Sequence, residues 1–302
     1  MNRISNIKKI YRIAIDSDYR FEVLSNKGFY KKLSDEEFSK RKFKFIFNKD
    51  LNLKNPITYN EKIQWLKLYD RNDYYTTLVD KYSVREEIKK IIGDSYLIPL
   101  LGVWDDANNI EFNKLPNQFV LKCTHNSGKG MCVCTNKNDL NIKKVIKKLN
   151  SGLKENYYLK SREWPYKNVK PRIIAEQFIG ENNRTPNDYK FFIIEGKIEC
   201  IMVCSDRDIN KTSFSYYDLE WNPYSNEKNE KKIPKPIMLN EMISITNKII
   251  EDLPKIHTYR IDLYNVKDKI YFGEITLYND GGFDDDITKE TDELMGSKIN
   301  LW

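Results

Sequence analysis

Apolar residues recur at helical spacing in several segments of the chain and mark where helices begin. Ser34 precedes a segment, 35–47, with acidic residues in its first turn and aromatic residues further on, which predicts a helix capped by Ser34. Thr58 is followed three residues later by Glu61, a pattern typical of a capping box ahead of an apolar helix face. Further helices are predicted over 80–93, ending at Gly93, and over 141–152 and 239–253.

Other segments alternate apolar and polar residues or form short apolar runs, as strands do. They lie at 96–104, 118–125, 130–135, 172–179, 188–205, 213–221 and 258–276. Helices come first, then a small mixed unit, then a strand-rich half with one inserted helix. This order favours an α+β fold with antiparallel sheets over a doubly wound parallel sheet. We expect a helical region over 1–75, a small αβ subdomain over 76–175 and a β-rich subdomain over 176–302.

The composition is that of a folded protein with a mixed surface. Of 302 residues, 40% are hydrophobic, and 51 basic residues against 44 acidic ones leave a net charge of +7. Because the lysines form short clusters among acidic residues, we interpret them as solvated helix faces and expect no nucleic-acid partner. Contact with an anionic membrane surface, where a lipid-linked substrate would lie, is the alternative.

Neither membrane insertion nor metal-binding cysteines are expected. No apolar run reaches the ~18 residues of a membrane span, and the N-terminus lacks a signal-peptide pattern, which predicts a cytoplasmic protein. With only two histidines in the chain, the cysteine spacing does not match a zinc site, and we expect free, buried thiols. The five are Cys123, Cys132, Cys134, Cys200 and Cys204.

The segment FVLKCTHNSGKGMCVC, residues 119–134, predicts a hairpin with a small, polar tip. It is neither a Walker loop, because no Ser or Thr follows Lys129, nor a G-x-G-x-x-G motif. Gly128 and Gly130 would let backbone N–H groups approach a polyanion. From these residues alone, a phosphate-holding loop and a plain hairpin tip both remain open.

The segment RIDLYNVKDKIYFGEIT predicts a second hairpin that carries acidic residues. Side chains two apart on a strand share a face, so Arg260 projects with Asp262 and Glu274 with Thr276. A turn at 266–269 brings Asp262 opposite or nearly opposite Glu274. Two converging carboxylates suit Mg²⁺, although a solvated acidic hairpin is the plain alternative.

Two further segments have more than one interpretation. RIIAEQFIG is a buried strand by composition. Where the strand passes into a connection, at Glu176 and Gln177, its backbone N–H and C=O groups could bind an adenine edge. The acidic run 284–286 could bind an amine or cap the helix that follows, and we favour capping. The acceptor of any reaction is expected to contact 151–172 or the tail from Asn279.

In this order, the pieces resemble the ATP-grasp fold and, within it, the TupA-like branch associated with teichuronopeptide and other surface-polysaccharide biosynthesis. The motifs that carry the resemblance are ITYNEKIQWLKLYD, VDKYSVREEI, FVLKCTHNSGKG, IIAEQFIG, DYKFFIIEGKI, and RIDLY followed by YFGEIT. They extend from about residue 50 to the end. The resemblance implies a nucleotide held between two αβ subdomains, after a helical N-terminal region.

The resemblance also implies residue roles. Lys81 and Lys122 would bind the α- and β-phosphates of ATP under a glycine-rich flap. The flap residues are Asn126, Ser127, Gly128 and Gly130; the adenine and ribose residues are Glu176, Gln177, Ile179 and Asp188. Arg260 would steady the transferred phosphoryl group, with Arg207 a second cation for the intermediate. The Mg²⁺ ligands would be Asp262, Glu274 and Thr276, although the family commonly has Asn in the place of Thr276.

The expected activity is an ATP-dependent carboxylate–amine ligase acting through an acyl phosphate. Its substrates would be a glycuronic acid or lipid-linked glycan and an amino acid or amine, handled in the cytoplasm or at the inner face of the membrane. The alternatives are a glycosyltransferase of surface-polysaccharide biosynthesis and a non-catalytic nucleotide-binding subunit.

Overall fold

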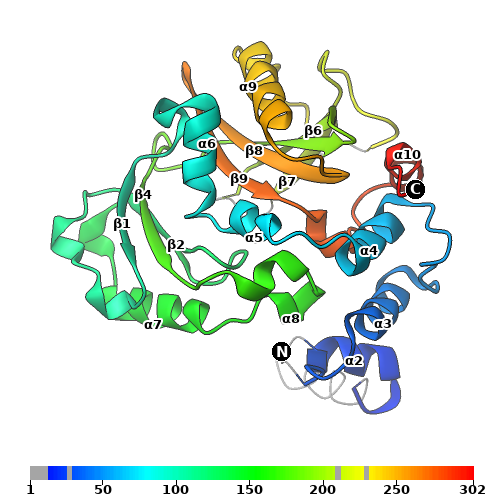
Figure 1. Ribbon diagram of the computed structural model, residues 1–302. Helices are drawn as coiled ribbons and strands as arrows, with labels where there is room; N and C mark the ends of the chain where they lie inside the picture. Colours follow the sequence, from blue (N-terminus) through cyan, green and yellow to red (C-terminus); the bar gives the residue numbers. More distant parts are fainter. Residues whose placement is uncertain (1–12, 26–28, 208–211, 228–230) are drawn as a thin grey trace.

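The computed structural model describes residues 13–25, 29–207, 212–227 and 231–302. It contains two antiparallel sheets with helices packed around them, as Figure 1 shows, so the predicted α+β class is confirmed. None of the described helices is long and apolar enough to span a membrane. All five cysteines are free, and all but Cys132 are buried, as expected.

The first sheet has the strand order β1-β4-β2-β3. Its strands are β1 (Leu100–Trp104), β2 (Phe119–Cys123), β3 (Met131–Cys134) and β4 (Ile173–Gln177). The predicted hairpin pairs in register, with Phe119 opposite Cys134. Helix α7 (Ile142–Leu153) buries Val145 and Leu149 in the same apolar cluster as β2 and leaves its lysines outside. β4 spans the predicted boundary at 175/176, and the three-part division of the chain remains a prediction.

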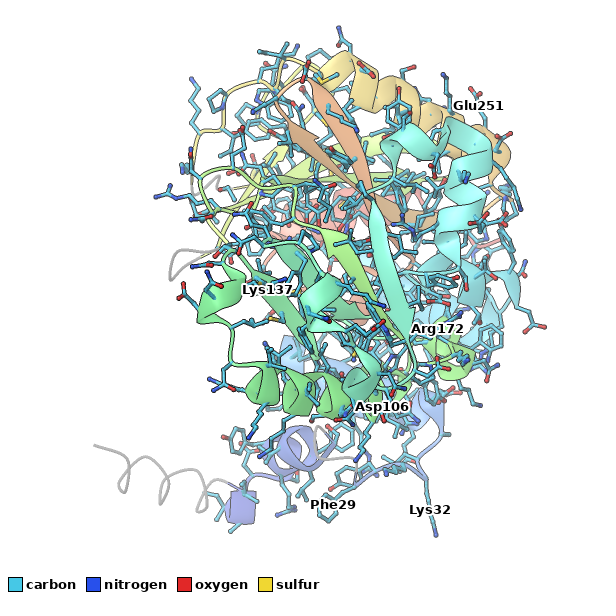
Figure 2. All side chains as sticks on the ribbon, turned by 90° about the vertical axis from the view of Figure 1, so that its left-hand side faces the viewer. Phe29, Lys32, Asp106, Lys137, Arg172 and Glu251 are labelled. Carbon is cyan, nitrogen blue, oxygen red and sulfur yellow. The ribbon has the colours of Figure 1, made fainter. Side chains whose placement is uncertain are left out.

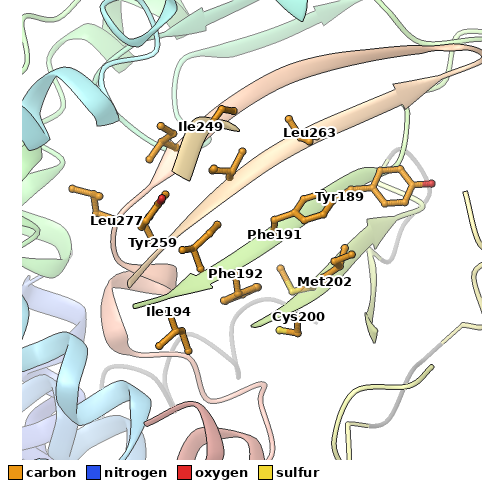
Figure 3. Packing of buried hydrophobic residues seen from close by; sticks show 14 of the residues in the cluster. Tyr189, Phe191, Phe192, Ile194, Cys200, Met202, Ile249, Tyr259, Leu263 and Leu277 are labelled. Carbon is orange, nitrogen blue, oxygen red and sulfur yellow. The ribbon is translucent and has the colours of Figure 1, made fainter. Parts of the chain in front are cut away.

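The second sheet has the order β7-β6-β5-β8-β9. Its strands are β5 (Asp188–Ile194), β6 (Lys197–Ser205), β7 (Ser213–Tyr217), β8 (Thr258–Val266) and β9 (Lys269–Thr276). Helix α9 (Leu239–Asp252) packs on this sheet, and Figure 3 shows Ile249 of the helix among the strand side chains. Phe191, Ile261 and Leu263 are fully buried in this core.

Strand register collects the polar residues of the second sheet on its other face. Lys190 lies opposite Asp262, and Asp262 lies opposite Glu274. Directly opposed residues share a face, so three neighbouring strands direct charged side chains to one side. A bulge at Gly273 separates this pair from the next, Leu263 with Phe272.

The predicted helices form with the predicted caps. Ser34 caps α3 (Asp35–Phe47), Thr58 and Glu61 form the capping box of α4 (Tyr59–Tyr69), and α6 (Val84–Ile92) ends at Gly93. Three short helices were not predicted, because four to nine residues give too little periodicity to recognise: α2 (Ser17–Ser25), α5 (Tyr74–Val79) and α8 (Tyr158–Ser161).

The capping interpretation of the acidic run is wrong. The last helix, α10 (Lys289–Lys298), begins after Thr288, whose hydroxyl accepts from the Thr291 N–H. Asp284 and Asp286 lie too early in the chain to cap it, and both side chains line a cavity instead.

The N-terminal helices lie at the end of the molecule away from α9. Figure 2 shows Phe29 and Lys32 at one end and Glu251, on α9, at the other. Within this region α4 contacts α10 and the 3-10 turn Asn279–Gly282, so the helical entry is docked against the tail of the chain.

Gly296 on α10 allows the close approach of α4. A Cβ at this position would lie 2.6 Å from the Thr58 carbonyl carbon and 2.6 Å from the Tyr59 nitrogen, both backbone atoms that cannot move aside easily. We predict that Gly296→Ala lowers the free energy of unfolding by about 1–3 kcal/mol through overpacking. Chemical denaturation measures this. Ser297→Ala, at the exposed neighbouring position, is the control, and equal stability of the two variants would contradict the packing argument.

Candidate active site

Two adjoining cavities open beside the polar face of the second sheet. The larger, about 340 Å³, lies between the two sheets, and the smaller, about 290 Å³, lies between the second sheet and the segments 157–166 and 276–286. Both are lined by Lys81, Ser127 and Glu274. The predicted site residues that line the larger cavity are Lys81, Lys122, Ser127, Gly128, Glu176, Gln177, Ile179, Asp188, Arg207 and Glu274.

Buried acids and bases alternate along the wall of these cavities. Lys190 Nζ lies 2.6 Å from Asp188 Oδ2 and also contacts Asp262 Oδ2. Arg260 binds both carboxylate oxygens of Asp262, at 2.6 and 2.9 Å. On the other side, Arg207 lies 3.1 Å from Asp188. Because each buried carboxylate has at least two cationic neighbours, the wall is close to neutral despite its many charges.

Glu274 continues this series toward the first sheet. Its carboxylate lies 3.0 Å from Lys81 Nζ and 3.9 Å from Arg260. Partial burial raises the pKa of Glu274, but the three cations Lys81, Lys190 and Arg260 outweigh it and hold the pKa below its usual range. We call the whole series the ion-pair chain; its members are Arg207, Asp188, Lys190, Asp262, Arg260, Glu274 and Lys81.

The three residues predicted to bind metal are not equally accessible. Glu274 borders both cavities, and Thr276 lines the smaller one, where its hydroxyl accepts from Arg260 at 3.3 Å. Asp262 lies directly behind Glu274 but is only 1% exposed and is covered by Arg260 and Lys190. Among the described residues, no group of three or more Asp, Glu, His or Cys side chains is arranged to hold a metal ion by itself.

The two predicted lysines reach the larger cavity, each from an ion pair with a glutamate. Lys122 on β2 lies 2.7 Å from Glu176 on β4, which also receives a hydrogen bond from Arg85 at 3.0 Å. Lys81 lies 3.0 Å from Glu274 and also donates to the Asn126 carbonyl at 3.0 Å. Lys81 therefore connects the hairpin tip of the first sheet to the second sheet.

The tip of the first hairpin is partly packed and partly open. Gly130, at φ +71°, lies against Gly152 of α7, and the Asn126 amide donates to the Gly152 carbonyl at 3.3 Å. Gly128, at φ +76°, has open space where a Cβ would stand, and it faces the larger cavity with Ser127. Of the described residues predicted for the site, only Asn126, Gly130 and Asp262 line neither cavity.

The end of β4 and the start of β5 form the far side of the larger cavity. The Gln177 N–H is already bonded to the Pro99 carbonyl at 3.0 Å, whereas the Ile179 N–H has no partner among the described residues. Asp188 is 2% exposed, and its Oδ1 has no hydrogen-bond partner in the described part of the chain. A buried acceptor without a partner fits a donor group of a ligand.

Several residues that line the cavities or hold their lining residues were missed from the sequence. Lys190 follows the predicted Asp188 by two positions in a strand, and this same-face spacing could have identified it. Arg85 lies in an amphipathic helix and gave no signal. The smaller cavity is lined by residues of both segments expected to contact the acceptor: Tyr157, Glu163 and Tyr166 in 151–172, and Asp280, Asp284 and Asp286 in the tail, although no motif singled out the first four. Tyr216, on β7, gave no signal.

Helix α4 holds the acidic loop of the smaller cavity in place. Gln64 donates to the carbonyls of Gly281 and Gly282 at 3.1 and 2.5 Å, and the buried Lys67 donates to Gly281 at 2.6 Å. The Asn60 side chain accepts from the Asp284 N–H at 2.9 Å and donates to its carbonyl at 3.0 Å. The helical entry region is therefore part of the framework of the site.

A fold of two antiparallel sheets with a charged cavity between them, and a lysine from each side reaching into it, is what the ATP-grasp resemblance implied. The model of the family described as TupA-like ATP-grasp matches residues 61–300. The chain belongs to the TupA-like ATP-grasp family. No curated protein sequence gives a significant match.

Solved structures with a similar chain path include ligases and a synthetase. D-alanine–D-alanine ligase from Bacillus anthracis, complexed with ATP, is 12% identical with a TM-score of 0.41 over 67% of this chain and 54% of that one. N5-carboxyaminoimidazole synthetase from Staphylococcus aureus, complexed with ADP, is 14% identical with a TM-score of 0.48 over 79% and 58%. D-alanine–D-alanine ligase from Helicobacter pylori is 16% identical with a TM-score of 0.46 over 80% and 69%. This chain thus spans little more than half the length of the first two proteins.

The ion-pair chain is expected to contribute to the free energy of unfolding through Lys190. Lys190 is 7% exposed and is shared by Asp188 and Asp262, so its removal leaves buried negative charge with fewer partners. We predict that Lys190→Met lowers the free energy of unfolding by about 3–5 kcal/mol. Chemical denaturation measures the change. The control is Lys197→Met on the neighbouring strand, where the lysine is exposed; a Lys190→Met variant as stable as this control would contradict the prediction.

Proposed function

We propose that the larger cavity binds ATP. The observation that carries the proposal is that Lys81 and Lys122, 41 positions apart in sequence, border one cavity together with Glu274 and Asp188. Both lysines would exchange their glutamate partners for the α- and β-phosphates. The open backbone at Ser127 and Gly128 would cover the phosphates.

The far side of the cavity would take the nucleoside. The Ile179 N–H, to which no described residue bonds, and the carbonyl of Gln177 suit an adenine edge, with Glu176 held behind them by Arg85 and Lys122. Asp188 Oδ1, which has no hydrogen bond within the described ranges, would accept from a ribose hydroxyl.

The donors present fit Mg²⁺ bound together with the nucleotide. Mg²⁺ usually takes one or two protein carboxylates and completes its octahedron with phosphate oxygens and water. Glu274 would supply the first carboxylate, with Asp262 and Thr276 beside it. The ion would neutralise charge on the phosphates, whereas the protein's own cation at this place is Arg260, fixed by Asp262 and Asn279.

The reaction proposed is the ATP-dependent joining of a carboxylate to an amine. Transfer of the γ-phosphoryl group from ATP to the carboxylate gives an acyl phosphate and releases ADP. Attack of the neutral amine on the acyl carbon then forms the amide and expels phosphate, and the amine loses a proton. Arg260 borders the smaller cavity beside Glu274, where it would stabilise the transferred group and the oxyanion of the tetrahedral intermediate. Arg207 lies at the other end of the ion-pair chain, beside Asp188, and it lines the larger cavity but not the smaller one. We therefore assign the stabilisation of the oxyanion to Arg260.

The substrates would be a glycuronic acid or lipid-linked glycan and an amino acid or amine of surface-polysaccharide assembly. The enzyme would work in the cytoplasm or at the inner face of the membrane.

Nucleotide binding has a direct test. Mg-ADP at about 100 times its dissociation constant should stabilise the wild-type protein by about 2.7 kcal/mol, seen as a higher melting temperature. Lys122→Met should bind Mg-ADP at least about tenfold more weakly, because one charge-assisted contact is lost. The control is Lys143→Met on the exposed face of α7. An unchanged melting temperature of the wild type with Mg-ADP would refute the nucleotide site.

The ligase activity is tested by ADP release in mixtures of Mg-ATP, glucuronic acid and a panel of amino acids. Release should require both a carboxylate and an amine. Glu274→Gln should reduce kcat by about 10²–10³-fold, because it removes the carboxylate that would hold Mg²⁺ at the phosphates. Asp268→Asn, in the exposed turn of the same hairpin, should leave kcat unchanged. Full activity of Glu274→Gln would contradict the assignment, and turnover of a nucleotide sugar without ADP release would favour a glycosyltransferase.

A further inference from the structure

The charges of the smaller cavity are divided between its two ends. At the end next to the nucleotide cavity, each cation of the ion-pair chain faces a carboxylate within hydrogen-bonding or ion-pair distance. At the other end stand carboxylates without such cations. They are Glu163, Asp280, Asp284 and Asp286, and none of the four forms an ion pair in the part of the chain that the structure describes.

Glu163 is the clearest case of a buried carboxyl group without an ion pair. It is 3% exposed, its Oε1 accepts from the Ser161 hydroxyl at 2.5 Å, and its Oε2 has no hydrogen bond to any described residue. Burial raises the pKa of this carboxyl. Lys67 lies nearby, but its Nζ donates to the carbonyls of Ser161 and Gly281. Lys67 and Lys42 lower the pKa of Glu163 from a distance, but neither forms an ion pair with it among the described residues, which leaves the carboxyl group open to a cationic ligand in the cavity.

The acidic loop points to the same conclusion from a separate part of the chain. Asp284 is buried, with hydrogen bonds from the Asn279 amide at 2.6 Å and the Asp286 N–H at 3.2 Å, neither of them from a charged group. Burial, with Asp280 next in effect, raises the pKa of Asp284 to about 7. Asn60, Gln64 and Lys67 hold the loop by its backbone, so its acidic side chains are fixed toward the cavity.

The remaining walls suit an ammonium group. Tyr157 and Tyr166 meet edge to face at 4.7 Å between ring centroids, and Phe214 and Tyr216 also line the cavity. Aromatic faces attract cations, whereas a carboxylate at this end would meet four acidic residues.

We propose that the acidic end of the smaller cavity, formed by Glu163, Asp280, Asp284 and Asp286 with the tyrosines beside them, binds the ammonium group of the amine substrate. This inference rests on the proposed ligase function, and it adds which end of the cavity each substrate occupies. The carboxylate substrate would lie at the cationic end, beside Arg260. The ammonium group would pass one proton to a carboxylate of the acidic end, and the resulting neutral amine would attack the acyl phosphate from that side.

The test uses 1,4-diaminobutane as the cationic probe and 1,4-butanediol as its neutral counterpart. Each is titrated calorimetrically into the full-length protein, with and without Mg-ADP. The diamine should bind at least about tenfold more tightly than the diol, as expected for one charge-assisted hydrogen bond. Succinate serves as the anionic probe and should bind more weakly than the diamine. Equal binding of diamine and diol, or tighter binding of succinate, would overturn the proposal.

Matched variants locate the site. Glu163→Gln and Asp286→Asn should each weaken diamine binding by about tenfold, and Asp286 is exposed enough to be replaced without unfolding the protein. The control is Asp285→Asn, which removes the same charge one residue away from a side chain outside the cavity. Equal losses in Asp285→Asn and Asp286→Asn would show a general field effect and overturn the site.

The same samples separate this inference from the proposed function. If Mg-ADP binds and the diamine does not, the amine site is wrong and the nucleotide site stands. If the diamine binds and Mg-ADP does not, the nucleotide proposal fails while the acidic cavity is a genuine cation site.

Discussion

Charge compensation between buried side chains is the constraint on which the site depends. Moving a carboxylate or a lysine out of water costs several kcal/mol unless an opposite charge and further hydrogen bonds replace the solvent. The ion-pair chain meets this requirement by alternating signs across β5, β8 and β9. Because each inner member is fixed by two neighbours, the cationic groups Lys190 and Arg260 are held in place before any ligand arrives.

This arrangement also limits how a ligand can bind. Lys81 and Lys122 are already paired with Glu274 and Glu176, so an incoming polyanion must displace carboxylates that hold these lysines. Glu176 can release Lys122 at little cost because Arg85 remains bound to it. Glu274 has Arg260 as a second cation at 3.9 Å. Each glutamate thus keeps one cationic neighbour when its lysine binds the ligand instead. No buried carboxylate is then left without an opposite charge.

Features of the site that depend on residues close in sequence could be predicted. Contacts between residues far apart in sequence could not. The capping box at Thr58 and the pairing of Asp262 with Glu274 depend on residues close in the chain, and both predictions hold. That Asp262 is covered by Lys190 depends on β5 lying next to β8, a neighbour relation between strands more than 60 residues apart. The same limit explains why the capping prediction for the acidic run was wrong: the position of this run depends on α4, over 200 residues earlier.

The contact between α4 and the acidic loop explains why a helical entry region belongs to the site. Gly281 and Gly282 have φ values of +61° and +71°, and their carbonyls accept hydrogen bonds from Gln64 and Lys67, three residues apart on α4. A loop with this backbone cannot satisfy those carbonyls itself, and burial without partners would be costly. The side chains of Asn60, Gln64 and Lys67 therefore supply the hydrogen bonds that stabilise the loop conformation. Since the same loop carries the acidic residues of the smaller cavity, the first helices of the chain determine the shape of a cavity built mostly by its last strands.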